Sequence, residues 1–479
     1  MEEDMKKDNL KQQLLKCAEN QPSGCSNGDE GSITTVLAFS VFFAVCGSFT
    51  AGCTKGYSSP IQSQIISDIG LSTADYSLFG SMLAIGGLLG SFMCGKITDY
   101  LGRRGAMGLS DILFLFGWLA IALSKDAWSL VLGRLLLGFS NSLVVYTVPI
   151  YIAEITPKNL RGGSVLIFQL MMSSGITLMY TIGLITRWRI LALIGIIPCI
   201  IQLCGLWFIP ESPRWLVKFG HVKSFEAALQ RLRGENVDIS QEATDIKGYI
   251  EAPENKEAEF FSVFSRKYTF ALTVGLGVMA LSGLAGTSGV LYYATSIFQS
   301  AGFSVSIGTV LMALLQLPPL FLGVFLMDKY GRRPLLMFSA GGLVAACLSL
   351  ALSFFLKEHG WFIEHSPYLA FIGIMIFSLS FPLGFGGIPF IIMSEIFPMD
   401  VKWAAGSLAI VVKHMCDFIV SYSFNFMMNW SSSGTFFIFT SINMFSVLFA
   451  TKFVPETKGR SLEELQDSLN PHFASKTNV

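Results

Sequence analysis

The chain has 479 residues, and its 33 basic and 33 acidic side chains give no net charge. This balance excludes a strongly basic surface for nucleic acid, and we expect no such partner. Charged residues make up 14% of the chain, hydrophobic residues 52%, and the mean hydropathy is +0.57, whereas a soluble protein carries about 25% charged residues. The composition therefore excludes an ordinary soluble protein and indicates apolar membrane helices packed through small residues.

The first 32 residues are polar and contain no apolar segment, so we do not expect a cleaved signal peptide. We interpret residues 1–32 as a disordered cytosolic tail. Within it, the segment Leu10–Leu15 has a Leu-x-x-x-Leu-Leu spacing. This spacing fits a dileucine sorting signal and equally a coincidence in an amphipathic tail, and the sequence leaves both interpretations open.

Twelve apolar runs are each long enough to cross a bilayer, for which about 20 residues are needed. The first six cover approximately residues 33–54, 76–98, 107–124, 128–152, 163–186 and 189–209. The second six cover approximately residues 268–298, 305–327, 335–356, 367–393, 402–428 and 433–454. We expect an all-α membrane protein with six-helix bundles at 33–209 and 268–454. A cytosolic linker, 210–267, contains a short helix near 225–233, and a second cytosolic tail covers 455–479.

Basic residues predict the orientation of these helices, because Lys and Arg concentrate in cytosolic loops. The turns after even-numbered helices are rich in them. The turns after odd-numbered helices carry few, and Arg187 and Arg189 in the fifth turn run against the pattern. We therefore expect both termini and the central linker to face the cytosol.

Three short motifs recur in the same order in the two halves of the chain. They are Asp-x-x-Gly-Arg-Arg at 99–104 and 328–333, Glu-Ile-x-Pro at 154–157 and 395–398, and a looser Pro-Glu motif at 210–214 and 455–459. A single short charged motif would be weak evidence, but three in register indicate a tandem duplication.

The charged residues of these motifs gather at the predicted cytosolic ends of the helices. Ionisable groups near a membrane are costly and therefore informative. We expect an ion-pair lattice that latches the two halves in one state and breaks when this face opens, which would make it a gate. Anchoring residues with local partners would explain one motif but not the paired pattern. The expected members are Asp99, Arg103, Arg104, Glu154, Arg161, Glu211, Arg214, Asp328, Arg332, Arg333, Glu395 and Lys402.

Five further ionisable residues lie inside apolar runs. Asp111 is in the third helix, and Arg134 lies near the start of the fourth. In the eleventh, Lys413 and Asp417 are one turn apart and can pair, with His414 beside them. Asp111 and Asp417 are each compatible with a structural role and with a direct role in transport.

A polytopic protein with duplicated halves can be a transporter, a channel, a membrane enzyme or a receptor. No Gly-rich loop ends in Gly-Lys-Ser/Thr, and the nine Cys and five His show no metal-ligand spacing. We therefore expect no cofactor, no metal and no enzymatic activity. Duplication around a central site favours transport by alternating access, with a transporter-like sensor as the alternative.

The motif set resembles that of the sugar porter family of the major facilitator superfamily over roughly residues 33–467. The segments 56–60, 286–293 and 424–426 resemble the plant early-responsive-to-dehydration-like monosaccharide transporters. This resemblance implies the major facilitator fold, with a monosaccharide such as glucose, fructose or a pentose held at mid-membrane mainly by the C-terminal half. It also implies the vacuolar membrane, with the plasma membrane as the alternative. A single chain suffices for this architecture, so we expect a functional monomer.

The resemblance also assigns candidate sugar-binding residues by position. Gln169 matches the family's helix-five glutamine, Gln316 stands for its helix-eight asparagine, and Phe390 stands for its helix-ten tryptophan.

The chain departs from the family pattern in helices seven and eleven. Ser282 and Gly283 replace the Gln-Gln pair of helix seven, and Ser288 replaces its following asparagine. These short side chains predict weak affinity and loose selectivity. Lys413 and His414 replace the Asn-Trp of helix eleven. These residues can put positive charge near the cavity, so the sequence leaves open whether the ligand is a neutral sugar or an anion.

A third departure concerns proton coupling. Proton-coupled members carry an Asp in helix one that pairs with the helix-four arginine, matched here by Arg134, but this chain has Thr54 at that position. We therefore expect facilitated diffusion in preference to proton symport. In the symport alternative, Asp111 or His414 would replace the missing carboxylate.

Overall fold

The computed structural model describes residues 34–157, 161–234, 237–251, 263–265, 268–397 and 401–457. Helices and their connections make up these ranges, and no strand occurs in them. The predicted N-terminal tail, with its Leu10–Leu15 segment, and nearly all of the predicted C-terminal tail lie outside the described residues.

Ten helical stretches of the described chain are long and apolar enough to cross a membrane. The 50-residue helix among them, α4, has a non-helical residue at Gly102, which divides it between the predicted spans 76–98 and 107–124. The shorter apolar stretch Ile167–Gly183 belongs to the predicted fifth helix. The described helices therefore account for all twelve predicted spans.

The N-terminal half contains the helices that precede the central linker. They are α2 (Thr35–Gly56), α3 (Ser58–Ile69), α4 (Thr73–Ala122), α5 (Ala127–Ile155), α6 (Arg161–Gly183), α7 (Trp188–Ile194) and α8 (Ile196–Gly205). Glycine lets α4 and α5 approach closely: a Cβ atom on Gly86 would lie 2.1 Å from the Leu135 carbonyl oxygen, and one on Gly138 would lie 2.2 Å from that of Leu83. This backbone contact fixes the second predicted membrane helix against the fourth.

The C-terminal half contains the helices that follow the linker. They are α12 (Thr269–Leu284), α13 (Thr287–Ala301), α14 (Val305–Leu315), α15 (Leu317–Tyr330), α16 (Arg332–Glu358), α17 (Ser366–Leu383), α18 (Ile388–Ile396), α19 (Lys402–Trp430) and α20 (Ser432–Phe453). The seventh predicted span is broken between α12 and α13, where Gly286 has a φ of 93°. Such a break exposes backbone groups in the middle of a span.

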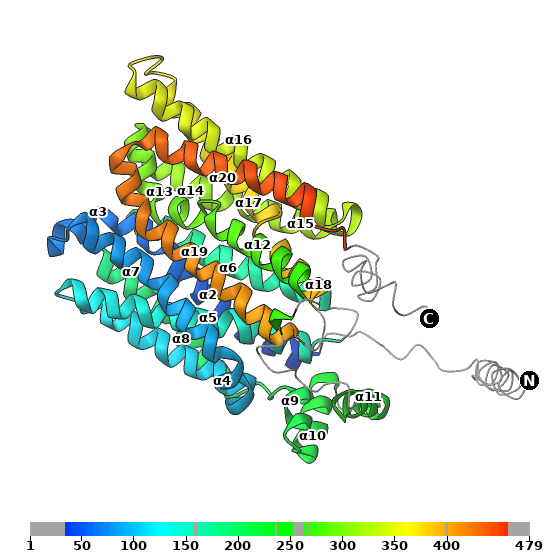
Figure 1. Cartoon of the computed structure of the whole chain (residues 1–479). Helices are drawn as coiled ribbons and strands as arrows, with labels where there is room; N and C mark the ends of the chain where they lie inside the picture. Colours follow the sequence, from blue (N-terminus) through cyan, green and yellow to red (C-terminus); the bar gives the residue numbers. More distant parts are fainter. Residues whose placement is uncertain are drawn as a thin grey trace, which may run out of the picture.

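Three linker helices lie together beyond one end of the bundle (Figure 1). They are α9 (Pro213–Lys218), α10 (Val222–Arg233) and α11 (Ser240–Glu251). The Arg233 guanidinium binds the Glu242 carboxylate at 2.9 and 2.8 Å and donates to the Ile155 carbonyl at the end of α5. The Thr34 hydroxyl, at the start of α2, donates to the Leu232 carbonyl. These bonds attach the linker helices to the N-terminal half. We call the end of the bundle that lies beside the linker helices α9, α10 and α11 the motif end.

The two halves make direct hydrogen bonds toward the end opposite the motif end. The bonded pairs are Ser59 with Thr295, Gln62 with Ser296, Ser77 with Asn425, Thr177 with Ala313, and Tyr180 with Leu291. A side chain at Gly80 would also meet the Tyr293 hydroxyl, with 2.7 Å between the two atoms. The halves are therefore closely packed at this end.

Candidate functional site

The repeated Gly-Arg-Arg motif builds the same backbone structure in both halves. Gly102 and Gly331 have φ values of 79° and 96°, in the left-handed region that favours glycine. The Arg103 and Arg104 N–H groups donate to the Glu211 carboxylate at 3.0 to 3.2 Å. In the second copy, two backbone N–H groups donate to one carboxylate in the same way, at 3.0 and 3.1 Å; these are Arg332, Arg333 and Glu456. A carboxylate thus caps the start of each following helix segment.

The side chains of the first copy form a closed network. The Arg103 guanidinium donates two hydrogen bonds to Glu154, at 2.9 and 3.0 Å, and one to Asp99 at 3.3 Å. The Ser212 hydroxyl donates to the same Glu154 carboxylate at 2.5 Å. Burial raises the pKa of the Glu211 carboxyl above its ordinary value, although backbone donors oppose the shift.

In the second copy, the side chain of Asp328, at the place of Asp99, lies outside the described part of the chain. Arg332 donates one hydrogen bond to Glu395, at 2.9 Å. The Arg332 Nε and the Glu395 Oε2 are buried and have no hydrogen-bond partner among the described residues, and the same holds for the Thr457 hydroxyl, at the place of Ser212. Arg104 and Arg333 each donate to a backbone carbonyl of their own half, those of Ile209 and Thr451.

The ion pairs found among the predicted lattice residues each join residues of one half. Arg214 lies part-buried in α9. Nothing is described of the side chains of Arg161, Asp328 and Lys402. A latch between the halves at the motif end therefore stays a prediction.

Arg134 is fully buried in α5 and has an aromatic environment. Its guanidinium lies over the ring of Phe79, 4.6 Å from the centroid, and 5.6 Å from that of Tyr57. Its Nη1 donates to the backbone carbonyl of Thr54 at 2.6 Å, and its Nε and Nη2 have no partner in the described chain. The partners of the Arg134 guanidinium are thus two aromatic rings and a backbone carbonyl, whereas the family resemblance implies a carboxylate.

Asp111, in α4, is also fully buried. Neither carboxyl oxygen has a hydrogen-bond partner among the described residues. A buried polar group without a hydrogen-bond partner is costly, which makes Asp111 a candidate for a functional role.

Two charged residues form an ion pair in the middle of α19. Lys413 and Asp417, one turn apart on α19, are joined at 2.6 Å, and the Ser288 hydroxyl donates to the other oxygen of Asp417 at 3.0 Å. Lys55 is part-buried on α2 of the other half. The Lys55 ammonium lies 3.5 Å from the sulfur of Met172.

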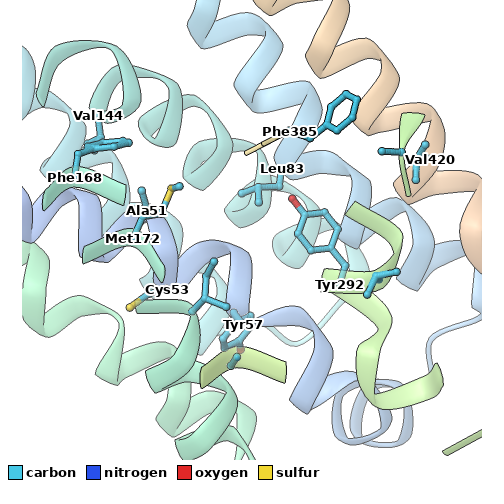
Figure 2. Close-up of a cluster of buried hydrophobic side chains, with 14 of the residues drawn as sticks. Ala51, Cys53, Tyr57, Leu83, Val144, Phe168, Met172, Tyr292, Phe385 and Val420 are labelled. Atoms are coloured by element: carbon cyan, nitrogen blue, oxygen red, sulfur yellow. The ribbon is translucent and has the colours of Figure 1, made fainter. Parts of the chain in front are cut away.

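His414 of α19 packs against Gly87 of α4. A Cβ atom on Gly87 would lie 2.9 Å from the Cε1 of the imidazole. Figure 2 shows a second contact between the halves nearby, where the Tyr292 side chain of α13 points toward Leu83 of α4. Lys413 and His414 therefore lie at the boundary of the two halves.

The other predicted sugar-binding residues have varied surroundings. Ser282 is buried and donates its hydroxyl to the Phe385 carbonyl at 3.3 Å. Gln169 in α6, Gln316 between α14 and α15, and Phe390 in α18 are part-buried. Their roles in binding stay predictions. Lys55 was not predicted, because a lysine near the end of an apolar run gives no signal beyond that of an ordinary helix-end residue.

The duplicated halves and their twelve helices define a multi-pass membrane protein with the major facilitator fold. The inward-open structure of the xylose transporter XylE from E. coli covers 90% of this chain and 99% of its own, with a TM-score of 0.76 and 23% identity. A structure of the proton:xylose symporter XylE bound to 6-bromo-6-deoxy-D-glucose gives a TM-score of 0.73 at 22% identity and covers 91% and 100% of the two chains. At this identity the likeness establishes the fold, and the predicted fold class is confirmed.

The family follows from closer similarity. The model of the family "Sugar (and other) transporter" matches residues 23–469, and the chain belongs to this family. Two Arabidopsis thaliana proteins are similar to it: sugar transporter ESL1, 47% identical over 92% of this chain and 94% of its own, and sugar transporter ERD6-like 7, 45% identical over 91% and 94%. The predicted resemblance to sugar porters of the early-responsive-to-dehydration type is confirmed.

Proposed function

We propose that this sugar transporter carries monosaccharides by facilitated diffusion, without moving protons. Hexoses such as glucose or fructose are the first candidates, and pentoses are the next. Ser282 and Ser288 reach less far than amide side chains, and both hydroxyls already donate to other groups of the protein. This supports weak affinity and loose selectivity among these sugars.

The surroundings of Arg134 carry the argument for facilitation. A proton switch on a buried arginine needs a carboxylate that alternates between pairing with the arginine and holding a proton. Here Thr54 offers its backbone carbonyl, and its own hydroxyl donates to the Ala51 carbonyl at 2.8 Å. Rings of Tyr57 and Phe79 cover the guanidinium, and neither supplies a carboxylate; the Tyr57 hydroxyl donates to the Trp188 carbonyl at 2.9 Å.

The first test is uptake of radiolabelled glucose and fructose by proteoliposomes, with and without an imposed proton gradient. We expect uptake that equilibrates and never concentrates the sugar. Accumulation driven by the gradient would overturn facilitation, and a folded protein without any flux would favour the sensor alternative.

A gain-of-function variant sharpens this test. Thr54→Asp places a carboxylate beside a guanidinium that has unpaired donors, so we expect sugar uptake to become dependent on external pH. The matched control Thr54→Asn has nearly the same volume and cannot take up a proton, and it should behave as the unaltered protein does. Equal pH responses in the two variants would contradict the role assigned to position 54.

Proton symport through Asp111 is the second candidate, because this carboxyl is fully buried and has no partner in the described chain. In this alternative, Asp111→Asn abolishes a pH response of uptake that the unaltered protein shows. His414→Ala is tested alongside it. Under facilitation, neither substitution changes the pH dependence.

The contacts between the halves favour an inward-facing state. They lie toward the end opposite the motif end, and the motif end bears the basic turns expected in the cytosol.

We further propose cytosolic termini, a functional monomer and a vacuolar location. A fluorescent fusion with Leu14 and Leu15 changed to alanine tests the sorting segment: relocation to the plasma membrane would support it.

A further inference from the structure

We propose that Arg134 binds a small monovalent anion such as chloride, which balances the charge of its buried guanidinium. The inference goes beyond the proposed function and does not depend on it, because it concerns a resident ion and not the sugar that is carried. It assigns a binding site to the N-terminal half, where side chains of α4 and α5 meet the end of α2.

Arg134 carries a charge that it cannot lose. A guanidinium stays protonated in proteins, and this one is fully buried. No ion pair in the described part of the chain includes Arg134. The rings of Phe79 and Tyr57 attract the cation, but this attraction is weaker than the cost of a buried charge without a counter-charge. An anionic partner would therefore stabilise this part of the fold.

The unpaired donors of Arg134 share one edge of the guanidinium. Nη1 donates to the Thr54 carbonyl at 2.6 Å, whereas Nε and Nη2, whose N–H groups point to the same side, have no partner among the described residues. Arg103 and Arg233 use this same edge, Nε and Nη2, to bind one carboxylate each, at 2.8 to 3.0 Å. A single anion can therefore accept from both unpaired donors of Arg134.

A further buried donor lies nearby. Tyr57 has helical backbone angles, φ −65° and ψ −41°, so the chain continues as a helix from Thr54 to Ser58. Residues four apart lie on the same face of a helix, about 6 Å from each other. The Ser58 hydroxyl is fully buried and has no partner in the described chain. We assign it to the site as a second donor, because a hydroxyl can turn toward an acceptor.

The surroundings favour a small ion with one charge. Arg134, Thr54 and Ser58 are all fully buried, and aromatic rings lie over the guanidinium. A sugar or a polyatomic acid would require these groups to move apart, whereas a halide requires only donors that point toward it. One guanidinium also needs only one negative charge, which favours chloride over sulfate or phosphate.

The experiment measures the apparent melting temperature in detergent while sodium chloride replaces sodium gluconate at constant ionic strength. Gluconate is the replacement because it is too large to reach a buried guanidinium. The variants are Thr54→Asp, whose carboxylate would take the place of the anion, and Thr54→Asn, the matched control of nearly equal volume without a charge.

We expect chloride to raise the melting temperature of the unaltered protein by about 2 °C or more, along a curve that saturates, as binding to the folded state implies. Bromide should act in the same way. Thr54→Asp should lose most of this shift, because a carboxylate held in the chain competes at a high effective concentration. Thr54→Asn should keep the shift.

A melting temperature that does not respond to chloride, or that changes without saturating, would overturn the inference. Equal responses in Thr54→Asp and Thr54→Asn would mean that chloride acts elsewhere, and would also overturn it. The titration of the unaltered protein needs no variant, so it decides the matter if Thr54→Asp does not fold. None of these outcomes bears on facilitated diffusion, which fails separately if a proton gradient drives sugar accumulation.

Discussion

The two copies of the Gly-Arg-Arg motif share their backbone and differ in their side chains. Both turn at a left-handed glycine, and both use one carboxylate to cap two N–H groups. In the N-terminal copy, Arg103 binds Glu154 with two hydrogen bonds, whereas in the C-terminal copy Arg332 binds Glu395 with one. The two copies thus share the cap, whereas the hydrogen bonds between the arginine and the glutamate differ between the halves.

Substitution of the shared glycines tests the common part and should have the largest effect. In Gly102→Ala and Gly331→Ala, the new Cβ would lie 2.5 and 2.6 Å from the capping carboxylate oxygens. The left-handed backbone adds about 1–2 kcal/mol, and displacement of the cap adds about 1.5–3 kcal/mol. We expect large and similar losses of stability in both variants, measured as the apparent melting temperature in detergent. A loss confined to one half would contradict the equivalence of the two caps.

Removal of the capping carboxylates should have the next largest effect. Glu211 accepts from the backbone N–H groups of Arg103, Arg104 and Ser212, and Glu456 accepts from those of Arg332 and Arg333 among others. Glu211→Ala and Glu456→Ala should therefore both destabilise the protein, with each loss on the order of 2–3 kcal/mol. The matched variants Glu211→Gln and Glu456→Gln keep one acceptor and should recover part of the loss. An alanine variant that melts at the same temperature as the unaltered protein would contradict the role of that cap.

Exchange of arginine for lysine separates the two copies. Lysine cannot reproduce a two-bond contact with a carboxylate, so Arg103→Lys should cost about 1–2 kcal/mol. Arg332→Lys replaces a contact of one hydrogen bond, and its effect should be about half as large. Melting temperatures measured in parallel give the comparison. Equal losses would mean that the two ion pairs are equivalent in solution.

The smallest effects are expected at the hydroxyls that follow the capping glutamates. Ser212→Ala removes a donor to Glu154 and should cost about 1 kcal/mol. Thr457→Ala removes a buried hydroxyl that has no partner in the described chain, so it should be neutral or slightly stabilising. A clear loss in Thr457→Ala would show that this hydroxyl finds a partner in the native protein.

The twelve helices could be predicted because crossing a bilayer requires about 20 apolar residues, whatever the packing. The breaks at Gly286 and Gln316 were not predicted, because a break within an apolar run leaves its hydropathy unchanged. Such a break depends on the packing of neighbouring helices, and at Gly286 the neighbouring side chain is that of Phe439.

Whether the charged motifs join the two halves stays a prediction. Among the described residues, Arg103 and Arg332 bind carboxylates of their own half. Charge alone does not tell which of several nearby carboxylates an arginine binds. Likewise, Thr54 revealed the missing carboxylate through the family pattern, but the rings of Phe79 and Tyr57 around Arg134 come from separate helices, which no spacing in the sequence connects.

The attachment of α10 has a mechanical consequence. Arg233 and Leu232 bond this helix to the end of α5 and the start of α2, so we expect the linker helices to move with the N-terminal half. A molecule that binds α10 or α11 would therefore act directly on the N-terminal half and only indirectly on the C-terminal half. Binding to the linker helices would thus act on the N-terminal half at the motif end, away from the hydrogen bonds that join the two halves at the opposite end.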